Sequence, residues 1–192
     1  MLFKRKRDFK PDRTDRGLLF KLYITPLQRL KILKWTLIGL LMLALSLLQD
    51  VLLSRLSIFG ATTDLVSCGI FLTVLLLEPE QGGIFALIAS TVFYFSGTSP
   101  GPYTIAVLTV LSLLLNILRH AFLQRTFLSV LLCGSAGLLI YQLFVFCVGL
   151  FLNFTTGARL PVFLITAGLS AVVIPILYPV VLAVSKIGGE TW

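Results

Sequence analysis

Residues 127–152 read FLSVLLCGSAGLLIYQLFVFCVGLFL, a run of 26 residues that contains no Asp, Glu, Lys or Arg. A helix rises about 1.5 Å per residue, so a run of this length can cross the roughly 30 Å hydrocarbon core of a bilayer. Long apolar runs without charge are typical of transmembrane helices. The sequence therefore predicts an integral membrane protein.

The rest of the chain has the same character. It is 57% hydrophobic and 12% charged, with a mean hydropathy of +1.00, far above the balance of a soluble domain. We expect an all-α integral membrane protein with about six transmembrane helices in a compact bundle. The further apolar runs are residues 35–53, 65–77, 84–97, 102–118 and 161–185.

Two of these runs, 65–77 and 84–97, have only about 14 residues each. Runs of this length are also compatible with buried core helices or re-entrant segments. Two crossings joined as a hairpin are favoured, because helix-breaking residues separate the runs. We expect a tight turn at 78–83, a second break at 97–102, a basic loop at 119–125 and a polar loop at 153–159.

The net charge of +8 comes from one part of the chain. Residues 1–34 hold eleven of the 16 basic residues and three of the eight acidic ones, and the remainder is neutral. We divide the chain into this segment and a six-helix transmembrane domain, 35–192. Residues 1–16 are expected to be a flexible cytoplasmic tail, and 17–34 an amphipathic helix in the headgroup plane or an extension of the first span.

The basic segment lies just before an apolar run, where it can contact anionic lipids. It has few aromatic residues between its charges, so we expect no nucleic-acid binding. Six spans place both termini on one side of the membrane, and fourteen basic residues then lie on the inner side against two outside. The positive-inside rule predicts a multi-pass protein of the cell membrane with cytoplasmic N- and C-termini.

Charged and polar residues within the spans are few. We expect Asp50 and Asp64 to lie at the outer ends of the first two spans, close enough to pair with Arg55 in a structural role. His120 is interpreted as a headgroup contact. No group of residues resembles a catalytic or metal site, so we expect no enzyme, no cofactor and no metal. Interhelical hydrogen-bond donors are expected at Asn116, Tyr141 and Gln142.

Small residues are concentrated in two of the spans, at 133–137 and 167–171, where they favour close helix packing. Two prolines are expected to kink the last span. The three cysteines lie in apolar runs without a CxxC pair, and we interpret them as packing residues without a disulfide. The prolines are Pro175 and Pro179, and the cysteines are Cys68, Cys133 and Cys147.

Residues 56–65, LSIFGATTDL, resemble the start of the second span in the rod shape-determining protein MreD family, which carries a similar Gly-x-x-Pro-Asp-Leu motif; Thr63 replaces the proline. The resemblance covers about residues 35–125. It departs from the family at Phe93, where many members have an Asp. Its other matching positions are Gln49, the 78–83 turn, Phe95, Ser96, Gly97, Gly101, Tyr103 and Arg119.

The resemblance implies a non-enzymatic membrane scaffold of the bacterial cell-elongation machinery, which builds peptidoglycan and sets rod shape. The implied partners are MreC, the SEDS glycosyltransferase with its transpeptidase, and MreB filaments. The family is similar in fold to the substrate-binding subunits of energy-coupling-factor vitamin transporters. The candidate partner or structural residues are Gln49, Asp50, Gly60, Asp64, Gly97, Gly101 and Tyr103.

Such a vitamin-binding subunit is the alternative function. Its size and number of spans are compatible with this chain. Those subunits usually carry an Ala-x-x-x-Ala pattern in the first span, for docking to the coupling subunit. Here Ala44 stands alone between bulky Leu and Met residues.

Overall fold

The computed structural model describes residues 26–51, 60–97, 99–122 and 126–187. The expected tail at 1–16, the first half of the amphipathic segment (17–25) and the basic residues Arg55 and Arg125 lie outside these ranges. The described residues form helices and no strand, as expected for an all-α protein. The helices are α1 (Pro26–Val51), α2 (Leu65–Leu76), α3 (Pro79–Phe95), α4 (Tyr103–Phe122), α5 (Phe127–Phe151), the short 3-10 helix η3 (Gly157–Arg159) and α6 (Leu160–Ser185).

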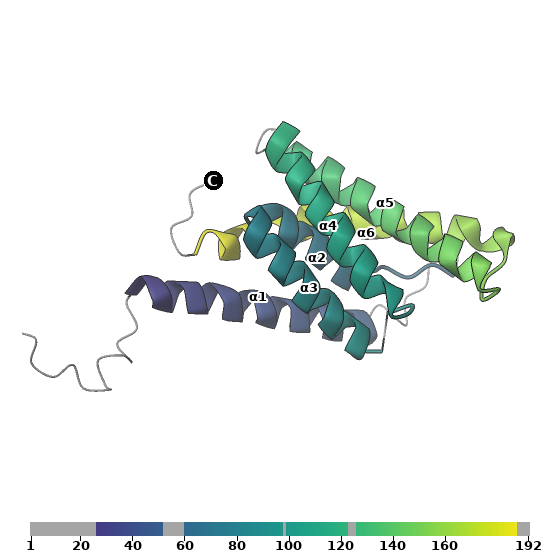
Figure 1. Ribbon diagram of the computed structural model, residues 1–192, viewed down its shortest axis with the longest axis horizontal. Coiled ribbons are helices and arrows are strands. Elements are labelled where there is room, and N and C mark those ends of the chain that lie inside the picture. Colours follow the sequence, from purple (N-terminus) through teal and green to yellow (C-terminus); the bar gives the residue numbers. More distant parts are fainter. Residues whose placement is uncertain (1–25, 52–59, 98, 123–125, 188–192) are drawn as a thin grey trace, which may run out of the picture.

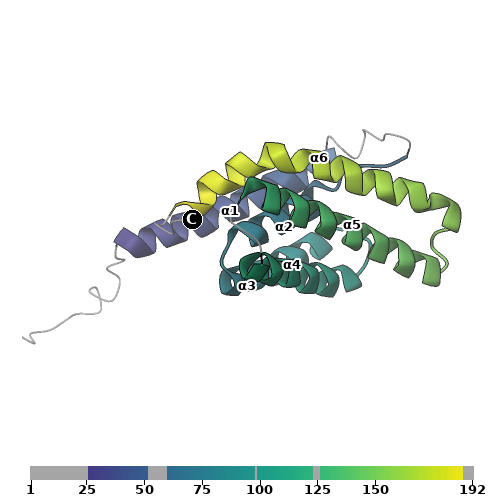
Figure 2. The same cartoon turned by 90° about the horizontal axis from the view of Figure 1, so that it is seen from above.

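The six α-helices run in alternating directions along the long axis of the molecule, so the start of α1 and the end of α6 lie at the same end (Figure 1). We call this end the terminal end, and the opposite one the hairpin end. At the hairpin end, α5 and α6 extend beyond the other helices and are joined through η3 (Figures 1 and 2).

α2 is the core of this bundle. Every residue from Leu65 to Leu76 is buried, and the helix contacts each of the other five α-helices. Its 12 residues span about 18 Å, which is too short to cross a bilayer from one surface to the other. The short second run therefore forms a core helix enclosed by longer ones.

The exposed surface of the bundle is strongly apolar. Large side chains such as Leu40, Val92, Leu132 and Val172 are more than half exposed. Small polar side chains lie inside, among them Ser67, Thr73, Ser90, Ser112 and Ser170, which are at most 1% exposed. An apolar outside around a partly polar inside is the arrangement expected when lipid is the solvent.

Four of the helices are long and apolar enough to cross a membrane: α1, α4, α5 and α6. The chain is thus compatible with a multi-pass membrane protein. α3 has 17 residues, about 25 Å, and also turns an apolar face outward through Ile84, Leu87, Ile88 and Val92.

Three boundaries differ from those expected. Residues 26–34 belong to α1, so this part of the basic segment is continuous with the helix of the first apolar run and is not a separate helix. The glycines of the expected 78–83 turn lie inside α3, because Pro79 occupies its first turn, where the missing N–H costs nothing. The expected loop at 119–125 begins later, since α4 continues to Phe122.

Small residues of the predicted stretch 133–137 bring the helices close together, whereas Gly168 of the stretch 167–171 has nothing within 4 Å of an added Cβ. A Cβ atom added to Gly137 of α5 would lie 2.6 Å from Leu115 of α4 and 3.2 Å from Phe71 of α2. Gly134 faces Ile174 of α6 in the same way, at 3.1 Å. α6 runs through both of its prolines as one helix.

Candidate functional site

Asp64 begins the site, at the N-terminus of α2. Its Oδ1 accepts a hydrogen bond from the Ser67 backbone N–H at 3.0 Å, which makes it the N-cap of the helix. An Asp at this position satisfies one of the unpaired N–H groups and places its negative charge at the positive end of the helix dipole. The local sequence Asp64-Leu-Val-Ser thus fixes where α2 starts.

Three other helices contribute polar side chains to the same place. Gln142 of α5 donates from Nε2 to Asp64 Oδ2 at 3.3 Å, and Ser170 of α6 accepts from the Asp64 backbone N–H at 2.9 Å. Gln49 of α1 accepts from the Val66 backbone N–H at 2.9 Å. The start of α2 is therefore held by α1, α5 and α6 together.

A cavity of about 220 Å³ opens beside this cluster. Asp64 is half-buried there, and the described partners of its carboxylate are the Ser67 N–H and the Gln142 amide. The wall is mixed, because two amides, three hydroxyls and the Asp64 carboxylate line it together with apolar and aromatic side chains. The residues lining it are Gln49, Gly60, Thr62, Thr63, Asp64, Phe93, Pro100, Gln142, Val145, Val162, Phe163 and Thr166. We call it the Asp64 cavity.

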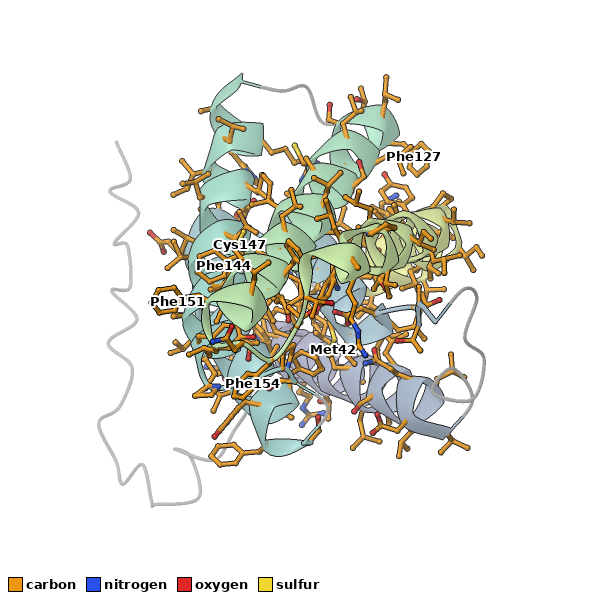
Figure 3. The ribbon with its side chains drawn as sticks, turned by 90° about the vertical axis from the view of Figure 1, so that its right-hand side faces the viewer. Met42, Phe127, Phe144, Cys147, Phe151 and Phe154 are labelled. Carbon is orange, nitrogen blue, oxygen red and sulfur yellow. The ribbon has the colours of Figure 1, made fainter. Side chains whose placement is uncertain are left out.

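The Asp64 cavity lies well below the tip of the hairpin end. Gln142 precedes the last residue of α5 by nine positions, and Ser170 follows the first residue of α6 by ten. At 1.5 Å per residue, both are about 14 Å from the tip. The tip itself is mixed: Phe151 and Phe154 are 86% and 81% exposed (Figure 3), and Asn153, Thr156 and Arg159 are exposed beside them.

The structure brings together three of the seven residues chosen from the sequence: Gln49, Gly60 and Asp64 all line the cavity. Gly60 has a φ of 79°, a left-handed conformation that glycine adopts without strain. Asp50 is exposed at the end of α1 and does not line it. The expected ion pair with Arg55 lies outside the described residues.

The remaining three shape the connection between α3 and α4. Gly97 has a φ of 77° just after α3. The carbonyl of Gly101 accepts from the Thr104 backbone N–H at 3.1 Å, at the start of α4. The ring of Tyr103 packs against Phe144 of α5, with ring centroids 6.5 Å apart.

The opposite end of α2 has a cap as well, formed by Asn116 and by Arg119, which was expected in a loop. Arg119 donates from a terminal guanidinium nitrogen to the Leu75 carbonyl and is only 2% exposed. Asn116 donates from Nδ2 to the Leu77 carbonyl at 3.4 Å. Carbonyls at the end of a helix have no partner within it, so they bind the nearest donors. Arg119 is therefore a core residue and not part of a loop.

The roles of Asn116 and Gln142 as interhelical donors are confirmed by these bonds. The Tyr141 hydroxyl is buried near Ser67 without a hydrogen-bond partner among the described residues. His120 is exposed in the last turn of α4 and contacts the Asn116 carbonyl at 3.0 Å. From the sequence, Ser170 was identified only as a small residue and Arg119 only as a cation in a loop. Both make their contacts with residues far away in the chain, and the neighbouring sequence does not indicate such contacts.

A second cavity, of about 330 Å³, lies between α1, α2 and α3. Its lining is apolar except for Ser46, and it includes Met42, Ile70, Phe85 and Ile88. Phe93 borders both cavities and is 3% exposed. We call this one the apolar cavity.

Among the residues that the structure describes, no three His, Cys, Asp or Glu side chains are grouped closely enough to hold a metal ion. The described cysteines are free, with Cys68 and Cys133 buried and Cys147 exposed. The exposure of Cys147 therefore disagrees with the buried packing role that was expected for it. Comparisons of the chain with protein-family models, with curated proteins and with solved structures found no match.

Proposed function

We propose that this chain is a non-enzymatic membrane scaffold of the MreD type, which holds MreC in the cell-elongation machinery of a bacterium. In this role it joins MreB filaments on the inner side of the membrane to the SEDS glycosyltransferase and its transpeptidase on the outer side. The basic segment 1–34 contacts anionic lipid, and both termini are cytoplasmic.

One observation carries this proposal furthest: the residues that resemble the family motif occupy a structural centre. Gly60 and Asp64, from the LSIFGATTDL stretch, meet Gln49 at the Asp64 cavity and fix the start of the buried helix α2. The motif has a structural role here, because it fixes the start of α2 and α2 contacts every other α-helix. The hairpin-end surface around it would then face the partner.

The departure from the family also falls at this cavity. Phe93 lines the wall where many family members have an Asp, so the cavity has Asp64 as its one described carboxylate. An aromatic side chain here separates the Asp64 cavity from the apolar cavity. We therefore expect partner binding to depend on Asp64 without a second acidic residue at position 93.

The proposal is tested by co-expression with MreC from the same organism. The tagged scaffold is solubilised in mild detergent and purified, and MreC is measured in the eluate against an unrelated membrane protein with one span. Retention of MreC through size-exclusion chromatography supports the proposal. Release of all MreC under conditions in which the scaffold remains folded would contradict it.

The vitamin-binding subunit is retained as the second candidate because of the apolar cavity. A volume of about 330 Å³ lies at the lower limit of the roughly 300–1,000 Å³ of small-molecule sites, whereas the Asp64 cavity falls below it. Such sites also need several polar groups to orient the ligand, and the apolar cavity offers only Ser46. A vitamin that remains bound to the purified, dialysed protein would favour this candidate.

A further inference from the structure

The apolar cavity is a groove between α1 and α3, with α2 as its floor. The two outer helices both pack against α2 but scarcely against one another. Towards the terminal end the gap is narrowed by the rings of Trp35 and Phe85, whose centroids are 6.3 Å apart. The floor is buried and the rim is open, so the groove faces the outside of the bundle. The rim residues Leu43, Ile88 and Val92 are each more than half exposed.

The groove opens at the middle of α1. This helix is long and apolar enough to cross a membrane from Gln28 to Val51. One face of it lines the groove, with residues spaced as on a helix: Gly39, Met42, Leu43 and Ser46. In a chain that crosses a membrane, an apolar opening at the middle of a span faces the hydrocarbon core.

The volume of the groove, about 330 Å³, decides what can fill it. One turn of an α-helix about 10 Å wide takes up about 400 Å³, so a helix of another protein does not fit inside. A narrow, unbranched hydrocarbon chain does. Filling is favourable, because atoms that line a void lose their dispersion contacts on that side.

The first turns of α1 supply positive charge beyond one end of the groove. They extend past the other helices at the terminal end (Figures 1 and 2) and carry the exposed cations Arg29 and Lys31. Lys31 precedes Gly39 by eight residues, about 12 Å along the helix. Helical spacing places the two cations on either side of the face that lines the groove, and Trp35 on that face. The apolar groove thus leads to a basic site.

α3 brings two carboxylates to the same end, and neither lies in the groove. Glu80 is in the first turn of α3, on the face opposite the residues that line the groove. Glu78 precedes the helix and accepts a hydrogen bond from Gln81 Nε2 at 3.5 Å. An anionic group at the terminal end of the groove therefore belongs beside α1 and not beside α3.

We propose that the apolar cavity holds one acyl chain of an anionic phospholipid, whose phosphate group lies against Arg29 and Lys31. Anionic headgroups attract basic side chains next to a span, and a Trp such as Trp35 is typical of the headgroup level. The lipid belongs to the leaflet at the terminal end. The inference concerns a lipid and not MreC, so it goes beyond the proposed scaffold function and can fail without it.

The first test fills the groove from a glycine. Gly39 lines the groove, and nothing lies within 4 Å of a Cβ added to it, so Gly39→Phe introduces a ring without a backbone clash. Gly168→Phe is the matched control, because Gly168 of α6 has the same free space and lies outside the groove. The full-length proteins are equilibrated in micelles with equal amounts of phosphatidylglycerol and phosphatidylcholine, and native mass spectrometry measures the bound lipid.

We expect one phosphatidylglycerol to remain on each wild-type chain after the detergent is removed. Gly39→Phe should weaken this binding about tenfold or more, because the ring takes the place of the acyl chain, and Gly168→Phe should leave it unchanged.

The second test removes the charge. The double variant Arg29→Gln with Lys31→Gln is compared with Arg159→Gln with Lys186→Gln, which removes two exposed cations elsewhere. One basic residue near an anionic headgroup is worth about fivefold in binding. The first pair should therefore lower the preference for phosphatidylglycerol over phosphatidylcholine about tenfold or more, and the control pair should preserve it. Because these residues are exposed, this test holds even where Gly39→Phe fails to fold.

Three results overturn the inference. One is a wild-type chain that retains no lipid or binds the two lipids equally. Another is equal lipid binding by the wild type and Gly39→Phe, with both shown to be folded by circular dichroism. The third is a different occupant, a vitamin or a second copy of the chain, whose binding is lost in Gly39→Phe. Each of these results leaves the binding of MreC to be judged by its own experiment.

Discussion

Asp64 and Arg119 cap opposite ends of the buried helix α2. Asp64 accepts from the Ser67 N–H at the N-terminus, and Arg119 donates to the Leu75 carbonyl near the C-terminus. The negative side chain lies at the positive end of the helix dipole and the positive one at its negative end. A short helix without access to water is thereby satisfied at both ends, which explains how α2 can occupy the core of a membrane bundle.

The N-terminal cap predicts a difference between two substitutions of Asp64. Asp64→Ala should lower the free energy of unfolding by about 1–2 kcal/mol, because the Ser67 N–H and the Gln142 amide lose their acceptor. Asp64→Asn should lower it much less. Thermal melts of the detergent-purified proteins measure this, and equal losses for the two variants would show that charge and not capping stabilises this end.

The C-terminal cap predicts a larger sensitivity at Arg119. Arg119→Met keeps most of the side-chain length but removes the donors to Leu75, which should cost about 1.5–3 kcal/mol. Arg159→Gln is the control, since Arg159 is exposed at the start of α6. The melting temperature should fall for the first variant only, and an unchanged value for Arg119→Met would refute the capping role.

The contact between α5 and its neighbours predicts that a side chain at Gly137 is destabilising, because Leu115 and the Phe71 ring must both move. Gly137→Ala places a methyl group 2.6 Å from Leu115 Cδ1, and overpacking of this kind costs about 1–3 kcal/mol. The matched control is Gly168→Ala in α6, where nothing lies within 4 Å of the added Cβ. Unfolding in increasing SDS compares the two, and a loss at Gly168 as large as that at Gly137 would contradict this packing.

The cysteines predict a pattern of chemical labelling. Cys147 lies on the exposed face of α5 near Phe144 and Phe151 (Figure 3), whereas Cys68 and Cys133 are buried. A membrane-permeable maleimide should modify Cys147 in the folded protein and the other two only after denaturation. Intact-mass spectrometry counts the adducts, with Cys147→Ser as the control that should show none before unfolding.

Much of the fold was predictable because its main signal is local. The limits of α5 and α6 agree with the apolar runs within about one residue, since a long uncharged run has one stable state in lipid. The predicted helix boundaries were wrong where a capping residue or a contact with a distant helix, rather than the local composition, decides where the helix begins or ends. Pro79 starts α3 before the glycines, and α4, whose Arg119 binds the Leu75 carbonyl, continues to Phe122, past the expected start of the loop.

The candidate site was predictable only in part. Gln49, Gly60 and Asp64 were identified from a short motif, and the structure places all three at one cavity. Their partners Gln142 and Ser170 are 78 and 106 residues away from Asp64 in the chain, and no local pattern indicates which helix faces which. Gln142 was expected to donate a hydrogen bond to another helix, but the sequence did not indicate that Asp64 is the acceptor.

The sequence by itself determined the strongly apolar composition of this protein, the order of its apolar runs and the concentration of its net charge in residues 1–34. These features follow from the composition and length of each apolar run. The free-energy cost of exposing a charge or an unpaired backbone group to lipid depends on the residues of that run and not on its neighbours. Only the tertiary structure decided that α2 is a fully buried core helix, with Asp64 at one end and Arg119 at the other. That outcome depends on which helix faces contact, and contacts between distant segments depend on the packing of all the helices together.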